Sequence, residues 1–348
     1  MKKSNAIANL IREDLRDIEA YSSARDEFSS EDKMIFLDAN ENPFDTHLNR
    51  YPDPYQSKLK SRISVIKNVP TRNIVLGNGS DEIIDLLIRL FCNPFQDNIL
   101  TFPPTYGMYK VAADLNAIDI KQVFLDDNFQ LNADKALVEA SKHTKIIFVC
   151  SPNNPSGNTI KRPEILKLIQ NFEGIVVVDE AYIDFAEEES FSTLLSQYKN
   201  LVVMQTFSKA YGLAGVRLGM CFANTEIVEY LNKIKPPYNV NTLTQKHALE
   251  RLNSVGEVSK EIQTILTERK KLSVQLKNIP WVKHIYPSQA NFLLVKVDEA
   301  NTRYNQCIEK NIVVRNRHTQ PNCENCLRFT IGTPEENQKL IETLKHLA

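Results

Sequence analysis

Short apolar runs alternate with longer amphipathic segments along the first two thirds of the chain. The segments Ile83–Phe91 and Arg162–Asn171 show the spacing of apolar residues that is typical of helices. Five apolar runs are short enough to be buried strands: Asn73–Leu76, Asn98–Phe102, Lys145–Cys150, Ile175–Val178 and Leu201–Met204. Strands that alternate with helices predict a mostly parallel sheet with helices on its faces.

Polar, aromatic or glycine residues follow each of the five runs. The following segments are, in order, Gly77–Asp81, Pro103–Tyr106, Ser151–Pro155, Asp179–Tyr182 and Thr206–Lys209. In open α/β sheets the carboxyl ends of parallel strands share one edge, and ligands bind beyond that edge. The pattern therefore predicts a single ligand site to which all five strands contribute.

Lys209 is the first candidate for chemistry at this edge. A second cation, Arg217, stands at the start of a sixth apolar run, Val216–Ala223. An antiparallel orientation of that run would bring Arg217 to the same edge as Lys209, and this orientation is a hypothesis. A lysine near another cation is disfavoured as an ammonium, so its pKa falls and its amine becomes a nucleophile. This is what a Schiff-base lysine requires.

The composition narrows the possible partners. The 348 residues carry a net charge of −1 and 24% charged side chains, so the charge gives no indication of a nucleic-acid or anionic-membrane partner. No apolar run approaches the length of a membrane span. Near the N-terminus the spacing of the apolar residues predicts one side of an amphipathic helix: Ile7, Leu10, Ile11, Leu15 and Ile18. These residues form no apolar core of signal-peptide length, so we expect no signal peptide.

The six cysteines are scattered along the chain, at Cys92, Cys150, Cys221, Cys307, Cys323 and Cys326. We interpret them as reduced, buried thiols of a cytoplasmic protein. Cys323 and Cys326 form a C-x-x-C pair with only His318 nearby, and the sequence has no second such pair. We therefore expect no zinc site and no redox role for this pair.

The segment that joins the first strand to its helix has two interpretations. Gly77 and Gly79 allow tight turns, and the helix N-terminus that follows would suit a phosphate. Ordinary capping by Ser80, with Asp81 in the first turn, explains the same residues. The segment matches neither a P-loop nor a dinucleotide fingerprint, which argues against both of those cofactor classes.

The other candidates also leave alternatives open. A buried Asp179 needs a partner such as a protonated pyridine nitrogen, or else binds Mg²⁺ as in nucleotide hydrolases. Asn154 and Tyr182 suit a phenolate oxygen, although the sequence around Asn154 is also turn-forming. Tyr106 either stacks on a planar ring or packs in its loop. Near the C-terminus, two arginines beside apolar runs can clamp a carboxylate or phosphate, or lie at the surface: Arg315 and Arg328.

Taken together, these residues resemble the fold-type I pyridoxal-phosphate aminotransferases, and within them the histidinol-phosphate aminotransferases. The resemblance extends from about Tyr21 to the last strand. It implies an α/β fold with a mostly parallel sheet flanked by helices, and a smaller α+β domain built from the N-terminal arm and the C-terminal third. The implied divisions are an arm over residues 1–48, a large cofactor-binding domain over 49–240 and a small domain over 241–348.

The resemblance also implies roles for individual residues. Lys209 would hold pyridoxal 5'-phosphate covalently, with Asp179 at the pyridine nitrogen and Arg217 at the phosphate. The remaining cofactor-binding residues would be Gly79, Ser80, Asp81, Tyr106, Asn154, Tyr182, Thr206 and Ser208. Tyr51 would reach the cofactor phosphate of a neighbouring subunit, which implies a homodimer with shared sites. The implied substrate-binding residues are Tyr21, Asn40, Glu41, Asn42, Arg315 and Arg328, and no metal is implied.

The reaction that this resemblance implies is amino transfer between histidinol phosphate and 2-oxoglutarate, a step of histidine synthesis. Two enzymatic alternatives share the cofactor residues: a decarboxylase of a phosphorylated amino acid, and an aromatic or branched-chain aminotransferase. A third alternative is a pyridoxal-phosphate sensor in a transcription regulator, for which the sequence predicts no DNA-binding module.

Overall fold

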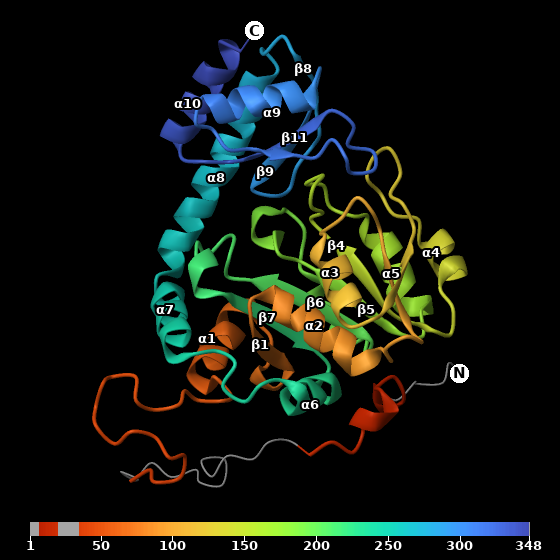
Figure 1. Cartoon of the computed structure of the whole chain (residues 1–348), viewed down its shortest axis with the longest axis vertical. Helices are drawn as coiled ribbons and strands as arrows, with labels where there is room; N and C mark the ends of the chain where they lie inside the picture. Colours follow the sequence, from red (N-terminus) through yellow and green to blue (C-terminus); the bar gives the residue numbers. More distant parts are fainter. Residues whose placement is uncertain (1–6, 20–34, 348) are drawn as a thin grey trace.

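The computed structural model describes residues 7–19 and 35–347, which form a larger and a smaller sheet with their helices (Figure 1). Within these residues the larger sheet has seven strands, in the spatial order β1 (Ile74–Asn78), β7 (Leu218–Ala223), β6 (Leu201–Thr206), β5 (Ile175–Asp179), β4 (Thr144–Cys150), β2 (Asn98–Thr101) and β3 (Asp119–Gln122). β7 pairs antiparallel with β1 and β6, and the other pairs are parallel. The predicted mostly parallel sheet and the antiparallel sixth run are both confirmed.

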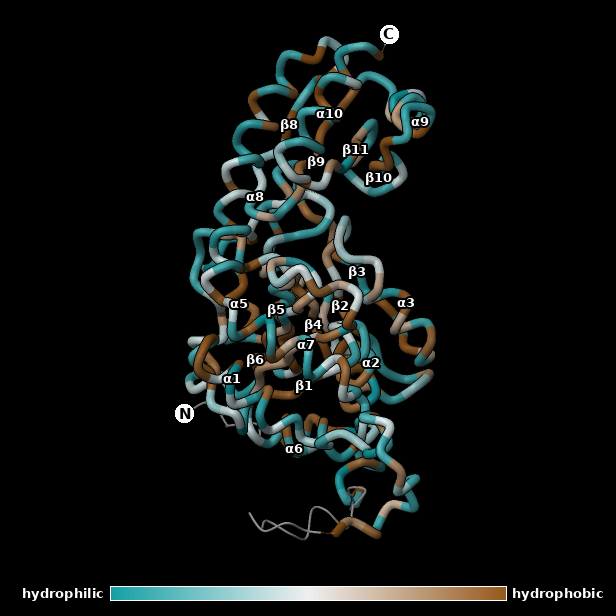
Figure 2. The backbone as a smooth tube through the Cα atoms, turned by 90° about the vertical axis from the view of Figure 1, so that its left-hand side faces the viewer, coloured by the Kyte–Doolittle hydropathy of each residue, from teal (hydrophilic) through white to brown (hydrophobic). Residues whose placement is uncertain are grey.

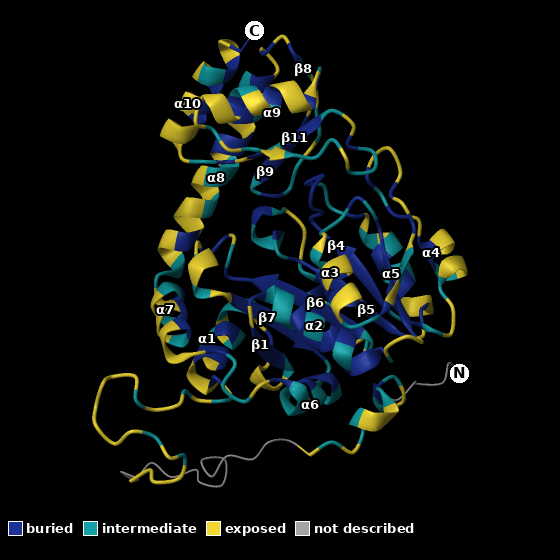
Figure 3. Cartoon of the chain, in the orientation of Figure 1, coloured by how far each residue is buried: buried dark blue, intermediate teal, exposed yellow. Residues whose placement is uncertain are grey.

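Helices cover both faces of the larger sheet because its buried strands carry apolar residues on both sides. In β4, Ile146 and Phe148 pack against one set of helices, whereas Ile147 and Val149 pack against the other set. The first set is α2 (Ser80–Phe91), α3 (Met108–Leu115) and α6 (Thr225–Ile234). The second set is α1 (Ser57–Lys67), α4 (Ala133–Glu139), α5 (Arg162–Asn171) and α7 (Thr242–Asn253). Figure 3 shows the buried sheet between helices whose outer sides are exposed.

The N-terminal segment differs from the prediction. Residues 7–19 form two single 3₁₀ turns instead of an amphipathic α-helix, η1 (Ile7–Asn9) and η2 (Glu13–Leu15). Ile7 and Ile11 are buried with apolar residues of α2 and α6, as their spacing suggested. The backbone N–H of Arg12 donates to the carbonyl of Leu90 at 3.1 Å, so docking onto α2 replaces a helical hydrogen bond. The prediction that the N-terminal arm builds part of the smaller domain is therefore wrong for residues 7–19.

The smaller sheet is antiparallel, in the order β10 (Arg315–Asn316), β11 (Cys326–Thr330), β9 (Phe292–Val297) and β8 (Val282–Ile285). It packs with α9 (Ala300–Glu309), α10 (Pro334–Lys345) and the second half of α8 (Val255–Leu276). Figure 2 shows α8 running from the larger to the smaller part. Val258 belongs to the core of the larger sheet, and Leu272 to that of the smaller sheet. We propose that the two units meet along α8. The domain boundaries at residues 49 and 241 stay predictions.

Two local features complete the fold. The apolar pattern did not predict β3, because this edge strand is polar and its four residues are at most half-buried. The remaining 3₁₀ turns are η4 (Thr71–Asn73), η5 (Ile183–Phe185), η6 (Phe191–Leu194) and η7 (Ala214–Val216). None of the described helices combines the length and the apolar character needed to cross a bilayer.

Candidate active site

One cavity of about 600 Å³ lies where β1, β4, β5 and β6 end. Its lining comes from both parts of the molecule, because Arg315 and Arg328 of the smaller sheet face residues of the larger one. The sequence-predicted residues that line it are Ser80, Asp81, Tyr106, Asn154, Asp179, Tyr182, Thr206, Ser208, Lys209, Arg217, Arg315 and Arg328. The structure thus brings together residues that are widely separated along the chain.

The turn between β1 and α2 forms a cationic cradle. Gly79 occupies the N-cap of α2 with φ +79°, and no side chain caps the helix, so the alternative of capping by Ser80 is wrong. A Cβ on Gly79 would lie 2.5 Å from Nη2 of Arg217, so the guanidinium lies directly against this turn. Arg217 also forms an ion pair with Asp81 at 3.1 Å. The free N–H groups of α2 and the Arg217 guanidinium together suit an anion such as a phosphate.

Asp179 ends β5 as a carboxylate that is only 3% exposed. The Tyr109 hydroxyl donates to its Oδ2 at 2.6 Å, and the backbone N–H of Ala181 donates to its Oδ1 at 3.1 Å. Burial raises the pKa of Asp179, and these two hydrogen bonds act in the opposite direction because they stabilise the ionised form. A carboxylate held in this way can pair with a protonated ring nitrogen.

Two polar side chains form the wall beside Asp179. The Asn154 amide donates to the hydroxyl of Tyr182 at 3.4 Å, and Nη1 of Arg328 donates to the Asn154 carbonyl oxygen. Tyr106 lies nearer the cradle, where its hydroxyl donates to Asp81 at 3.0 Å. Burial and the Asp81 carboxylate raise the pKa of Tyr106, so it remains a neutral donor. The polar groups of Asn154 and Tyr182 and the ring of Tyr106 therefore line the same cavity.

Lys209 follows β6 and its amine lies 5.6 Å from the centre of the Tyr182 ring. Lys209 is an exposed residue, so water reaches its side chain, but the cavity walls partly desolvate the amine. Burial is the largest cause of its lowered pKa, and the positive charge of Arg328 is the next. Arg217, which the sequence pattern singled out, lowers the pKa of Lys209 by a smaller amount. The direction of the expected shift is as predicted, but burial dominates it.

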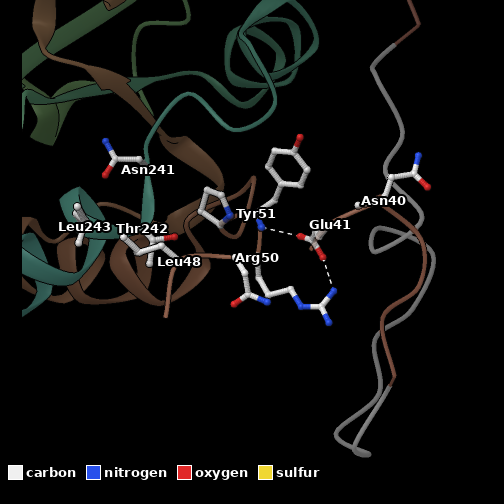
Figure 4. Close-up of a pocket in the computed structure, with 11 residues that line it drawn as sticks. Asn40, Glu41, Leu48, Arg50, Tyr51, Asn241, Thr242 and Leu243 are labelled. Atoms are coloured by element: carbon white, nitrogen blue, oxygen red, sulfur yellow. Dashed lines mark hydrogen bonds and ion pairs between the residues drawn. The ribbon is translucent and has the colours of Figure 1, made fainter. Parts of the chain in front are cut away.

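The predicted residues of the N-terminal arm lie elsewhere in this chain. Asn40, Glu41 and Tyr51 line a separate cavity of about 400 Å³ with Asn241, Thr242 and Leu243 of the larger unit, and these two cavities share no lining residue. Figure 4 shows Glu41 accepting hydrogen bonds from Arg50 at 2.7 Å and from the backbone N–H of Tyr51 at 2.6 Å.

Two further arm residues belong to the substrate-binding prediction. Asn42 is exposed, and its side chain accepts from the backbone of Phe44 at 3.0 Å. Tyr21 lies outside the described residues. The arm therefore contributes nothing to the Lys209 cavity of its own chain within the residues that the structure describes.

Comparison with known proteins identifies this arrangement. The chain matches the family model of aminotransferase class I and II over residues 35–344. It is 54% identical to the histidinol-phosphate aminotransferase of Flavobacterium johnsoniae over 343 residues, which is 98% of each chain. The chain belongs to the histidinol-phosphate aminotransferase family.

Solved structures of this family have the same fold. The histidinol-phosphate aminotransferase of Clostridium acetobutylicum superposes with a TM-score of 0.79 at 24% identity, over 86% of this chain and 90% of that one. The Sinorhizobium meliloti enzyme, solved in complex with pyridoxal 5'-phosphate, gives a TM-score of 0.79 at 20% identity, over 86% and 84% of the two chains. At these identities the likeness establishes the fold, and the predicted fold-type I class is confirmed.

The cavity fits pyridoxal 5'-phosphate, the cofactor of this aminotransferase family. The Gly79 turn leaves the backbone open where a side chain would collide with Arg217, and this open cradle suits the phosphate. Asp179 offers a buried anion for a pyridinium nitrogen, and Asn154 with Tyr182 offers donors for a phenolate oxygen. These groups thus suit the phosphate, the ring nitrogen and the phenolate oxygen of the cofactor.

Sequence reasoning missed several residues of this aminotransferase site, among them Tyr109 and Arg317. Tyr109 is buried on α3 and reaches Asp179, but nothing local in the sequence marks its partner. Arg317 also lines the cavity. A signal for Arg317 was present, because it stands two residues after Arg315 and alternate residues of a strand share one face.

We expect Tyr109→Phe to change the pH dependence of cofactor binding, so that binding is lost at a higher pH on the acid side. Its hydroxyl stabilises the ionised form of Asp179, so its loss raises the pKa of this carboxyl and allows protonation at higher pH. We expect a cofactor affinity about 10-fold weaker, as for loss of one hydrogen bond to a charged group. Cofactor titration of the apoenzyme across pH measures both effects, and an unchanged profile would contradict the role of Tyr109.

Proposed function

We propose that this chain catalyses amino transfer between L-histidinol phosphate and 2-oxoglutarate, giving imidazole acetol phosphate and glutamate in histidine biosynthesis. The observation that carries the proposal is Lys209, a lysine with a lowered pKa in a cavity that also holds Asp179 and a group of cations. The high identity to histidinol-phosphate aminotransferases over nearly the whole chain supports the reaction and the substrate.

Each cofactor residue has a role that its surroundings support. Lys209 would hold the cofactor through its amine, and its Nζ would accept and return the proton of the substrate carbon. Asp179 keeps the ring nitrogen protonated, and Arg217 with the start of α2 binds the phosphate. Bound pyridoxal 5'-phosphate supplies an electron-accepting ring.

The arginines of the smaller sheet are suited to the substrates. Histidinol phosphate carries a phosphate and no carboxylate, whereas 2-oxoglutarate carries two carboxylates. Arg328 donates to Asn154 and lines the cavity with it, and Arg315 stands opposite Arg328 on β10. Because a planar guanidinium can bind either anion through paired hydrogen bonds, the same residues can serve both half-reactions.

We propose in addition a homodimer in which each arm serves the neighbouring site. Residues 35–55 carry several exposed apolar side chains, and Tyr51 stacks on Tyr238 away from the Lys209 cavity. Figure 3 shows this exposed segment extending away from the body of the chain. Large exposed apolar residues grouped on one segment favour a protein partner. A monomer in analytical ultracentrifugation of the active enzyme would contradict the dimer.

A biosynthetic role and unpaired cysteines support a cytoplasmic location, which we also propose. The six cysteines are all free thiols within the described residues.

A two-substrate assay tests the reaction. We expect glutamate to form from 2-oxoglutarate with histidinol phosphate as donor, and the cofactor absorbance to follow each half-reaction. Release of carbon dioxide without a need for an oxo acid would indicate the decarboxylase instead. Equal activity with donors that lack the phosphate, such as L-phenylalanine, would indicate the aromatic aminotransferase.

A further inference from the structure

Three arginines share one face of the strand pair β10–β11. Arg315 stands directly opposite Arg328 in the antiparallel register, so both point to the same side. The backbone N–H of Arg317 donates to the carbonyl of Cys326 at 2.9 Å, which extends the ladder by one more residue. Arg317 lies two residues beyond Arg315 and so belongs to the same face. All three arginines line the Lys209 cavity.

The structure provides no protein anion for this group. Within residues 7–19 and 35–347, no ion pair with a carboxylate involves any of the three arginines. Nε of Arg317 and Nε of Arg328 are buried without a hydrogen-bond partner in the same part of the chain. Like charges that face one another across strands are destabilising, and buried unpaired donors are costly. An anionic ligand would relieve both conditions.

Arg317 remains a cation in this setting. Burial lowers its pKa to about 10, and the positive charges of Arg328 and Arg315 add to this effect. At neutral pH the guanidinium of Arg317 is therefore still protonated, although its charged form is less stable than that of an arginine in water. Its side chain is not needed to hold the strand pair, because the bond to Cys326 comes from the backbone.

We propose that Arg317 is a third anion-binding residue of the substrate site and selects donors that carry a phosphate. The resemblance to the family assigns this task to Arg315 and Arg328, and the geometry adds Arg317 on the same face. A phosphate monoester dianion has three terminal oxygens, each with room for more than one donor, so a third guanidinium finds acceptors that two leave free. The inference rests on the proposed function, since it concerns the substrate of that reaction.

The variant Arg317→Gln tests the proposal in the holoenzyme, where the cofactor already fills the cradle at Arg217. We expect KM for histidinol phosphate to rise about 10–100-fold, with kcat and cofactor content within twofold, because the contact is to the substrate alone. KM for unphosphorylated L-histidinol is expected to change less than threefold. Arg317→Lys keeps the charge and loses the planar fork, so its KM for histidinol phosphate is expected between those of wild type and Arg317→Gln.

Lys296→Gln is the matched control. Lys296 stands opposite Cys326 on β9, in the same row of the sheet as Arg317, but it is exposed and does not line the cavity. This variant removes one positive charge from the same row and is expected to leave every KM unchanged. A similar loss in both variants would show an effect of net charge and overturn the proposal.

Calorimetric titration of the holoenzymes with inorganic phosphate provides a readout that needs no turnover. We expect Arg317→Gln to weaken phosphate binding about 10-fold relative to wild type and to Lys296→Gln. Unchanged phosphate binding, or equal losses with histidinol and histidinol phosphate, would overturn the role of Arg317. Failure of wild type to use histidinol phosphate would instead contradict the proposed function, and the phosphate titration would still decide the role of Arg317.

Discussion

Lys209→Ala is expected to lose covalent attachment of the cofactor and to lower kcat by at least about 10³-fold. The residue supplies both the attached amine and the proton transfer, and a positioned acid or base alone contributes about 10²–10⁴-fold. Alanine cannot replace either task. The lowered pKa of Lys209 makes the neutral amine available at lower pH than a lysine surrounded by water would allow. A distant lysine cannot substitute, because attachment and proton transfer both require an amine inside the cavity.

Reduction with borohydride followed by dialysis measures the attachment, since only a covalently held cofactor is retained. Lys270→Ala is the control, because Lys270 is an exposed residue in the second half of α8. Circular dichroism is expected to show the same helix content in both variants. Turnover of Lys209→Ala near the wild-type rate would refute the central assignment of the site.

Asp179→Asn is expected to lower kcat by about 10²–10³-fold and to weaken cofactor binding. The change keeps the size of the side chain, but its single carbonyl oxygen can accept only one of the two hydrogen bonds that Tyr109 and the backbone N–H of Ala181 donate to the two oxygens of Asp179. It removes the buried negative charge that holds a proton on the ring nitrogen. Loss of one partner of a buried, hydrogen-bonded charge pair costs about 2–5 kcal/mol, which corresponds to this range of rates.

The neighbouring residue Glu180 offers a matched control. Glu180 is also buried, but its carboxylate accepts from Ser190, from Gln205 and from the backbone of Phe191, and it does not line the cavity. Glu180→Gln is therefore expected to lower thermal stability while the bound cofactor keeps its absorbance. A loss of cofactor affinity as large in Glu180→Gln as in Asp179→Asn would show that the effect of Asp179 is only structural.

The sequence was informative where local periodicity decides structure. The strands β1, β2, β4, β5 and β6 begin and end within two residues of the predicted runs, because buried parallel strands must be apolar on both sides. β3 escaped prediction because an edge strand can satisfy its backbone with few apolar residues. The N-terminal segment has the predicted apolar spacing, but its contact with Leu90 belongs to tertiary structure and prevents a regular helix.

The sequence predicted only part of the cause of the Lys209 pKa shift. The sequence placed Arg217 near Lys209, which is correct, because both follow from the order of strands along the chain. It did not predict that Arg328 has the larger electrostatic effect, since that residue comes from the other sheet. The distance between Arg328 and Lys209 depends on how the smaller unit packs over the cavity.

The sequence by itself thus determined the parallel sheet, the edge at which its polar loops meet, and the residues that suit pyridoxal 5'-phosphate. The apolar runs of the strands and the turns that follow them are local properties, so the sequence alone can predict them. Only the tertiary structure decided that Tyr109 supports Asp179, that Arg317 joins Arg315 and Arg328, and that Tyr51 lies away from Lys209 of its own chain. These three placements depend on contacts between elements that are distant in sequence. Burial and packing determine such contacts, and local sequence patterns do not predict them.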